Sequence, residues 1–84
     1  MNELRDYYLE SSRVRLEDLR AAFDRGDVDE LRRHFHAFSG MGGTYGFPRI
    51  SLLGDEAEGL LRSPDAAALA RCRELMDEIA RELC

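Results

Sequence analysis

The sequence predicts an all-α protein, an antiparallel up-down-up-down four-helix bundle. Apolar residues recur every three or four positions over four segments, as they do on one face of an α-helix. Valine, isoleucine and threonine, which are typical of strands, are few. The connections between the segments are short, so consecutive helices are expected to lie side by side in opposite directions.

The first helix is expected from about Asn2 to Phe23. Its apolar stripe consists of Leu9, Ser12, Leu16, Leu19 and Phe23. Tyr8 and Leu4 extend this stripe toward the amino terminus. Gly26 is expected to end the helix in a left-handed conformation, which glycine adopts easily.

The second helix is expected to begin at Asp27, which forms a capping-box-like start with Glu30 three residues later. Its apolar stripe consists of Val28, Leu31, Phe35, Phe38, Gly42 and Tyr45. Because this periodicity continues through a glycine-rich stretch, it favours a continuous helix over a loop. The helix is then expected to end at Gly46-Phe47-Pro48.

The third helix is expected to start at Pro48. Ser63-Pro64 should stop it and start the fourth, with serine as cap and proline in the first turn. The apolar face of the third helix consists of Ile50, Leu53, Ala57, Leu60 and Leu61. That of the fourth consists of Leu69, Cys72, Met76, Ile79 and Leu83. Cys72 is therefore expected to be a small core residue.

Length and charge limit the possible classes of function. The 84 residues are enough for a single domain over 1–84 with a simple core. The net charge of −5 and the absence of a basic stripe argue against a nucleic-acid partner. Without a long apolar run or a signal peptide, no membrane partner is expected, and the expected location is cytoplasmic. Met1 and the short length favour a stand-alone protein.

The most informative stretch runs from His36 to Phe47 and reads HAFSGMGGTYGF. It places Gly40, Gly42 and Gly43 in a predicted helix, where each glycine costs about 1 kcal/mol relative to alanine. Close approach of another surface to His36 would compensate for this cost.

The phase of the apolar stripe separates the two histidines. At about 100° per residue, His36 lies roughly 130° from the centre of the stripe, on the solvent side. His34 lies only about 70° from it and is expected to be a boundary residue. Gly42 falls on the core side. The residues that share the face of His36 are Arg32, Arg33, Ser39, Gly40 and Gly43.

An exposed imidazole beside arginines has the chemistry to carry a phosphoryl group. Imidazole offers a neutral ring nitrogen near pH 7, and this nitrogen can attack phosphorus without a separate base. Guanidinium groups suit phosphate and would carry part of its charge. The chain has no lysine, no Gly-Lys-Ser/Thr phosphate loop and no acidic cluster assignable to magnesium, so a partner would have to supply the remaining machinery.

Residues 36–47 resemble the signature of histidine-containing phosphotransfer (HPt) domains. That pattern is a histidine, two residues, often a lysine, then a glycine, with a second glycine six positions further on. Gly40 and Gly46 match the two glycines. The Gly-Thr-Tyr-Gly-Phe end is similar to the phosphotransfer domain of chemotaxis histidine kinases. Ala57-Glu58 stands where the next helix of the family often has Leu-Glu.

The resemblance implies a four-helix bundle in which His36 is phosphorylated and Gly40 leaves room for a partner. The implied partners are the receiver domain of a response regulator and a histidine kinase or hybrid kinase. The chain would be a phosphoryl carrier and not an enzyme, with no cofactor of its own, because the receiver brings the aspartate and Mg²⁺. Ser39 stands where many members have lysine, and Arg32 or Arg33 could replace the missing charge.

The leading hypothesis is therefore an intermediate of a two-component phosphorelay. A non-catalytic docking module is the alternative: its glycine-rich face would bind a receiver or kinase without phosphorylation of His36, and the uncharged Ser39 favours it. A phosphate-binding enzyme that uses the glycines as a loop is disfavoured, because no strand precedes them and the required lysine is missing.

Overall fold

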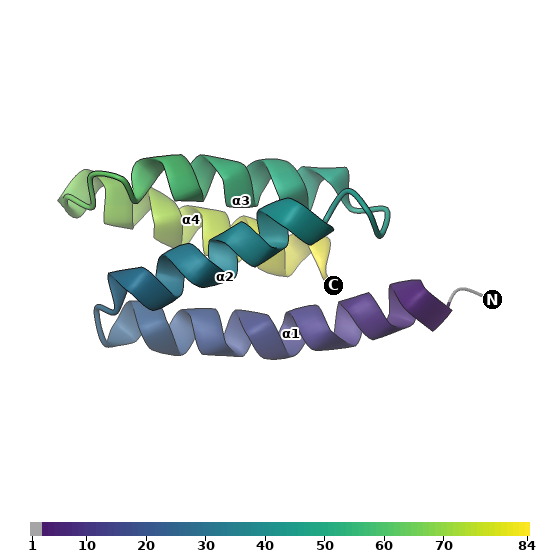
Figure 1. The fold of residues 1–84 in the computed structure, drawn as a ribbon. Helices are drawn as coiled ribbons and strands as arrows, with labels where there is room; N and C mark the ends of the chain where they lie inside the picture. The colour runs from purple at the N-terminus through teal and green to yellow at the C-terminus, as the bar shows by residue number, and fades with distance from the viewer. Residues whose placement is uncertain (1–2) are drawn as a thin grey trace.

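A computed structural model describes residues 3–84 of the chain as four α-helices. The helices are α1 (Glu3–Asp24), α2 (Val28–Met41), α3 (Pro48–Leu60) and α4 (Ala66–Glu82). Consecutive helices run in opposite directions, as predicted (Figure 1). Each of α1 and α3 packs against both α2 and α4, so within residues 3–84 helices α2 and α4 lie diagonally across the bundle. This arrangement leaves one side of α2 open to solvent between α1 and α3.

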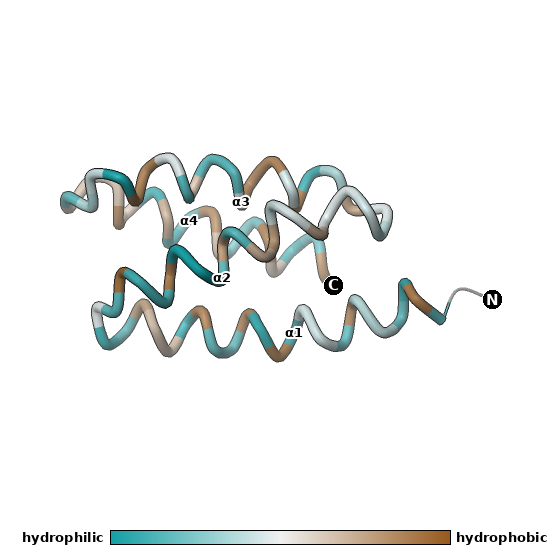
Figure 2. The backbone as a smooth tube through the Cα atoms, viewed as in Figure 1, coloured by the Kyte–Doolittle hydropathy of each residue, from teal (hydrophilic) through white to brown (hydrophobic). Residues whose placement is uncertain are grey.

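The core is built from the apolar stripes of the four helices. Polar and apolar residues alternate along each helix, as amphipathic packing requires (Figure 2). The buried core residues are Leu19, Ala22, Leu31, Phe35, Phe38, Ile50, Leu53, Ala57, Leu61, Cys72, Leu75, Met76, Ile79 and Leu83. Cys72 is fully buried as predicted, and this burial raises the pKa of its thiol to about 11.

Helix α1 follows the prediction except at its first turn. The predicted start, Asn2, lies outside the described residues, and the helix ends at Asp24. Gly26 has a φ of 71° and takes the predicted left-handed conformation. The assignment of Leu4 to the apolar stripe is wrong, because its side chain is 68% exposed. Leu4 instead lines an open hollow together with Thr44, Tyr45 and Gly46 of the turn after α2.

Helix α2 begins as predicted but ends earlier. The side chain of Asp27 caps the helix and accepts a hydrogen bond from the backbone N–H of Glu30 at 3.2 Å. The prediction of a continuous helix through Tyr45 is wrong, because α2 ends at Met41 and residues 42–46 form a turn. The apolar periodicity persists past the helix end because Tyr45 still contacts the bundle, where its ring stacks on that of Tyr8 at 5.0 Å.

Gly46 reverses the chain between α2 and α3. Its φ of 88° is in the left-handed region, and Phe47 then donates a hydrogen bond to the carbonyl of Gly42 at 2.7 Å. Pro48 is in the first turn of α3, as predicted. The predicted start of α4 at Ser63-Pro64 is wrong. Asp65 is the cap, because its carboxylate accepts the backbone N–H of Ala68 at 2.8 Å.

Glycines bring α2 and α3 unusually close together. A methyl group placed at Gly54 would lie 2.7 Å from both the carbonyl oxygen of Phe35 and the backbone nitrogen of Ser39. A methyl group at Gly42 would lie 2.7 Å from the backbone nitrogen of Ser51. Gly42 therefore serves packing, as its core-side phase predicts. The close crossing places the side chains of α3 directly beside those of α2 that surround His36.

Candidate functional site

His36 projects from α2 into solvent on the open side of the helix. Its side chain is 75% exposed, in agreement with the predicted phase. The nitrogen Nδ1 lies 2.9 Å from Oε2 and 3.1 Å from Oε1 of Glu58 on α3. A carboxylate only accepts hydrogen bonds, so this contact favours the tautomer in which Nδ1 carries the proton. The lone pair of His36 is then on Nε2, which is free to act as a nucleophile.

Glu58 is a site residue that the sequence reasoning did not assign. It entered that reasoning only as the second residue of the Ala57-Glu58 pair. A usable signal was present, because Glu58 directly follows the core residue Ala57 and therefore borders the buried face of α3. Its pairing with His36 depends on the register of α3 against α2, which the spacing within one helix does not contain.

Gly40 leaves an open surface one turn after His36. A methyl group at this position would meet no atom within 4 Å. No packing contact therefore requires glycine here, although glycine costs an exposed helix about 1 kcal/mol. Gly43 is equally open, but it lies in the turn that follows α2. Only Gly40 of the three glycines lies within α2, so the expected helix penalty applies to this residue alone.

Ser39 faces α3 and is bound to a carboxylate. Its hydroxyl donates a hydrogen bond to Oδ1 of Asp55 at 2.7 Å, and its carbonyl accepts one from the hydroxyl of Ser51. The position where the resemblance to HPt domains implies a lysine thus holds a serine paired with an acidic residue.

The two arginines before His36 lie on different sides of α2. Arg32 is on the α3 side, where it donates a hydrogen bond to the carbonyl of Leu61 at 3.1 Å and lies 3.8 Å from Asp29. Arg33 pairs with Glu30 at 2.6 Å and lines a hollow with residues of α1. Arg32 is therefore the cation on the same side of α2 as the His36–Glu58 pair.

His34 is a buried partner of α1. Arg15 donates a hydrogen bond to its Nδ1 at 3.0 Å, and its Nε2 lies 3.3 Å from Glu30. This arrangement fits a neutral ring that accepts from Arg15 and donates to Glu30. Burial lowers the pKa of His34, and the positive charge of Arg15 lowers it further. The structure thus places His34 in the bundle and His36 at the surface.

An open apolar groove lies between α1 and α2, beside Gly40. Tyr7 is 67% exposed and Met41 is 40% exposed, and both line the groove together with Ser11 and Ala37. The exposed face of α2 is therefore continuous from His36 across Gly40 to this groove.

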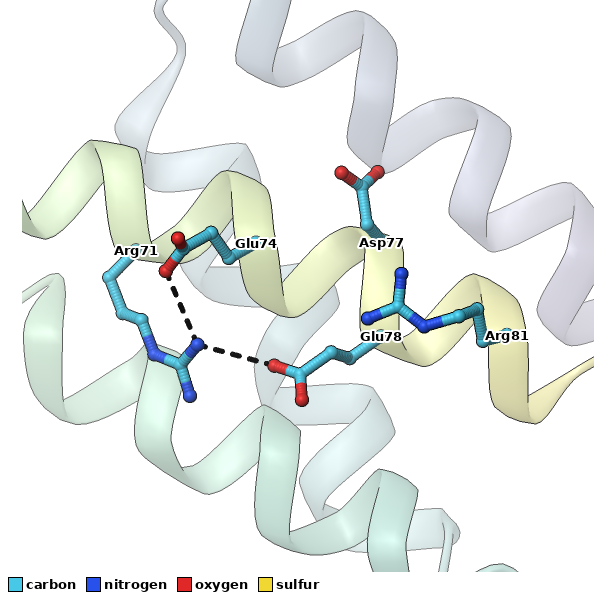
Figure 3. Close-up of a pocket in the computed structure, with 5 residues that line it drawn as sticks. All are labelled: Arg71, Glu74, Asp77, Glu78 and Arg81. Carbon is cyan, nitrogen blue, oxygen red and sulfur yellow. Dashed lines mark hydrogen bonds and ion pairs between the residues drawn. The ribbon is translucent and has the colours of Figure 1, made fainter.

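A hollow on α4 holds ion pairs that lie away from His36. Arg71 reaches Glu74 and Glu78 at 3.3 Å each, and Asp77 and Arg81 complete the hollow (Figure 3). Arg71 also binds Glu56 of α3 at 2.7 Å. Helix α4 packs against α3, and the ion pair of Arg71 with Glu56 joins these two helices. These charges therefore belong to the packing of the bundle.

A family model of the Hpt domain matches residues 3–83. The chain therefore belongs to the Hpt domain family, whose members are phosphoryl-carrier modules of phosphorelays and fold as four-helix bundles. Searches of curated proteins and of solved structures returned no match. None of the helices within residues 3–84 combines the length and the apolar character needed to cross a bilayer.

Proposed function

We propose that this protein accepts a phosphoryl group on Nε2 of His36 and exchanges it with the aspartate of a receiver domain in a two-component phosphorelay. The observation that carries the proposal is the contact between His36 and Glu58 at 2.9 Å, on a side chain that is 75% exposed. Glu58 favours the tautomer with a nucleophilic Nε2 and also orients the ring.

The exchange needs no base from this chain. As Nε2 forms its bond to phosphorus, the bond between phosphorus and the aspartate oxygen of the receiver breaks, and the carboxylate leaves with the bonding electrons. The ring becomes positively charged while Nδ1 keeps its proton, and Glu58 stabilises this charge through the existing contact. The receiver is expected to supply Mg²⁺, which offsets the charge of the phosphoryl group in transit.

The surface around His36 fits the approach of such a partner. Gly40 leaves space beside the ring, and the apolar groove that contains Tyr7 and Met41 continues from it. Exposed apolar side chains that border a reactive group are typical of surfaces covered on binding. Arg32, one turn before His36 and on the side of Glu58, is the cation that we assign to the phosphoryl group.

The decisive experiment is transfer from phosphorylated receiver domains in the presence of Mg²⁺. We expect an acid-labile, alkali-stable label that is lost in His36→Gln and retained in His34→Gln. Phosphoramidate, a small phosphoryl donor to histidine, serves as a partner-independent control. Label that persists in His36→Gln would refute the assignment of the site. Binding of receivers or kinases without any label would instead favour the docking module.

A further inference from the structure

Asp55 lies close to the proposed phosphorylation site and carries the same sign of charge as a phosphoryl group. Asp55 and Glu58 are three residues apart on α3 and share the face that meets α2. Glu58 contacts His36, and Asp55 accepts a hydrogen bond at 2.7 Å from Ser39, three residues after His36. Ser39 lies about 4.5 Å further along the axis of α2 than His36, because each helical residue adds about 1.5 Å. The Asp55 carboxylate is therefore held about one turn from the contact between His36 and Glu58.

No cation neutralises Asp55 within the described part of the chain. None of the ion pairs among residues 3–84 includes Asp55. Arg32 lies on the same side of α2 but one turn before His36, whereas Asp55 lies beyond it. The site is therefore electrostatically asymmetric along α2, with a cation toward its start and an uncompensated carboxylate toward its end.

We propose that Asp55 sets the balance of phosphoryl exchange by disfavouring the phosphorylated form of His36, which makes the chain a ready donor to its partner's aspartate. This inference rests on the proposed function. When the phosphorus–oxygen bond to aspartate breaks and the bond to Nε2 forms, the product carries a positive ring and a dianionic phosphoryl group. Glu58 attracts the ring, whereas Asp55 repels the phosphoryl group. The two neighbouring carboxylates therefore act in opposite directions.

The test compares variants that each remove one negative charge. Asp55→Asn keeps an oxygen that can accept from Ser39, so it removes the charge and preserves the contact. The exchange equilibrium with a receiver domain should shift toward phosphorylated His36 by roughly two- to fivefold at low salt, because exposed charges about one helical turn apart interact weakly in water. Glu58→Gln should shift it the other way. Glu74→Gln, on α4, should leave it unchanged.

Ionic strength separates an electrostatic effect from a structural one. The gain in Asp55→Asn should shrink in about 1 M salt, where the screening length falls to roughly 3 Å. An unchanged or lowered equilibrium in Asp55→Asn at low salt, or a gain that salt does not alter, would overturn the proposal.

A partner-independent measurement keeps this inference distinct from the proposed function. With phosphoramidate, a bond from Nε2 to phosphorus forms as ammonia leaves, and no receiver is needed. Asp55→Asn should accelerate labelling of His36 by this anionic donor roughly twofold at low salt. If labelling occurs but no receiver exchanges, the assigned partner is wrong while the role of Asp55 is still measured. If labelling is not accelerated, the role of Asp55 is refuted.

Discussion

Glu58 on α3 contacts Nδ1 of His36 on α2 through both carboxylate oxygens, at 2.9 and 3.1 Å, although 22 positions separate the two residues in the chain. This contact orients an otherwise exposed ring and leaves Nε2 as its outward nitrogen. The proposed nucleophile and the carboxylate that orients it thus come from different helices, and the close crossing of α2 and α3 at Gly54 brings these helices together.

Glu58→Gln should slow phosphorylation of His36 by phosphoramidate and by a receiver domain. The amide can still meet Nδ1, but it neither fixes the tautomer nor offsets the positive ring. Because His36 is largely exposed, solvent screens part of the effect, and we expect a loss of roughly three- to tenfold. Initial labelling rates measure it. Glu56→Gln, two residues earlier on the side of α3 that meets α4, is the control, and an equal loss in both variants would contradict the role of Glu58.

Gly40 and Gly54 should respond in opposite ways to alanine. Gly40→Ala adds a methyl group to open space in an exposed helix and should stabilise the protein by about 1 kcal/mol. Gly54→Ala would press on the backbone of α2 and should destabilise it by about 1–3 kcal/mol. Thermal unfolding measures both changes, and about 1 kcal/mol corresponds to roughly 4–8 °C in a domain of this size. A destabilised Gly40→Ala would contradict the open surface.

The helices and the core were predictable because each depends on local spacing along the chain. Leu31, Phe35 and Phe38 form the buried stripe of α2, and the phase of this stripe alone places His36 in solvent. The end of α2 was mispredicted because apolar periodicity indicates which residues are buried and does not show whether those residues are helical. Tyr45 is packed against the bundle from a turn, which gives the same spacing signal as a helical residue.

The electrostatic surroundings of His36 were not predictable in the same way. They depend on which residues of α3 face which residues of α2, and this register is set by the backbone contact at Gly54. The sequence therefore indicated arginines beside His36 but not the carboxylates of Glu58 and Asp55. It also could not indicate that Arg33 pairs with Glu30 while Arg32 stays on the α3 side.

Bulk at Gly40 should block the partner without blocking the chemistry. Gly40→Leu should keep the helical fold, since its side chain would project into solvent. Transfer from a receiver domain should fall by at least about tenfold, because a large side chain would separate the two reacting surfaces. Labelling by phosphoramidate, which is small, should persist. Unchanged transfer from the receiver would contradict the role of Gly40 as an access surface.

Tyr7 and Met41 should contribute to receiver binding and not to the reactivity of His36. Tyr7→Ala or Met41→Ala should weaken binding by roughly five- to tenfold, as truncation of large apolar contacts does at interfaces. Titration calorimetry with a receiver domain measures the affinity, and the labelling rate with phosphoramidate should stay the same. Leu52→Ala, at an exposed apolar residue of α3 outside the groove, is the control. Equal effects in all three variants would contradict docking at this groove.

His34 should make the stability of the bundle depend on pH. Its surroundings include Arg15 and Asp18 of α1 and Glu30 and Arg33 of α2, and burial followed by the charge of Arg15 lowers its pKa in the folded state. The unfolded chain then binds a proton at His34 more readily than the folded chain does. The contribution of neutral His34 to stability is therefore fully present above the usual histidine pKa of about 6.5, and it is lost as the pH falls below that value. Denaturant unfolding at about pH 7.5 and 5.5 should show this loss in the wild-type protein and in His36→Gln, but a smaller loss in His34→Gln. An identical pH dependence in His34→Gln and the wild-type protein would show that protonation of His34 is not linked to folding.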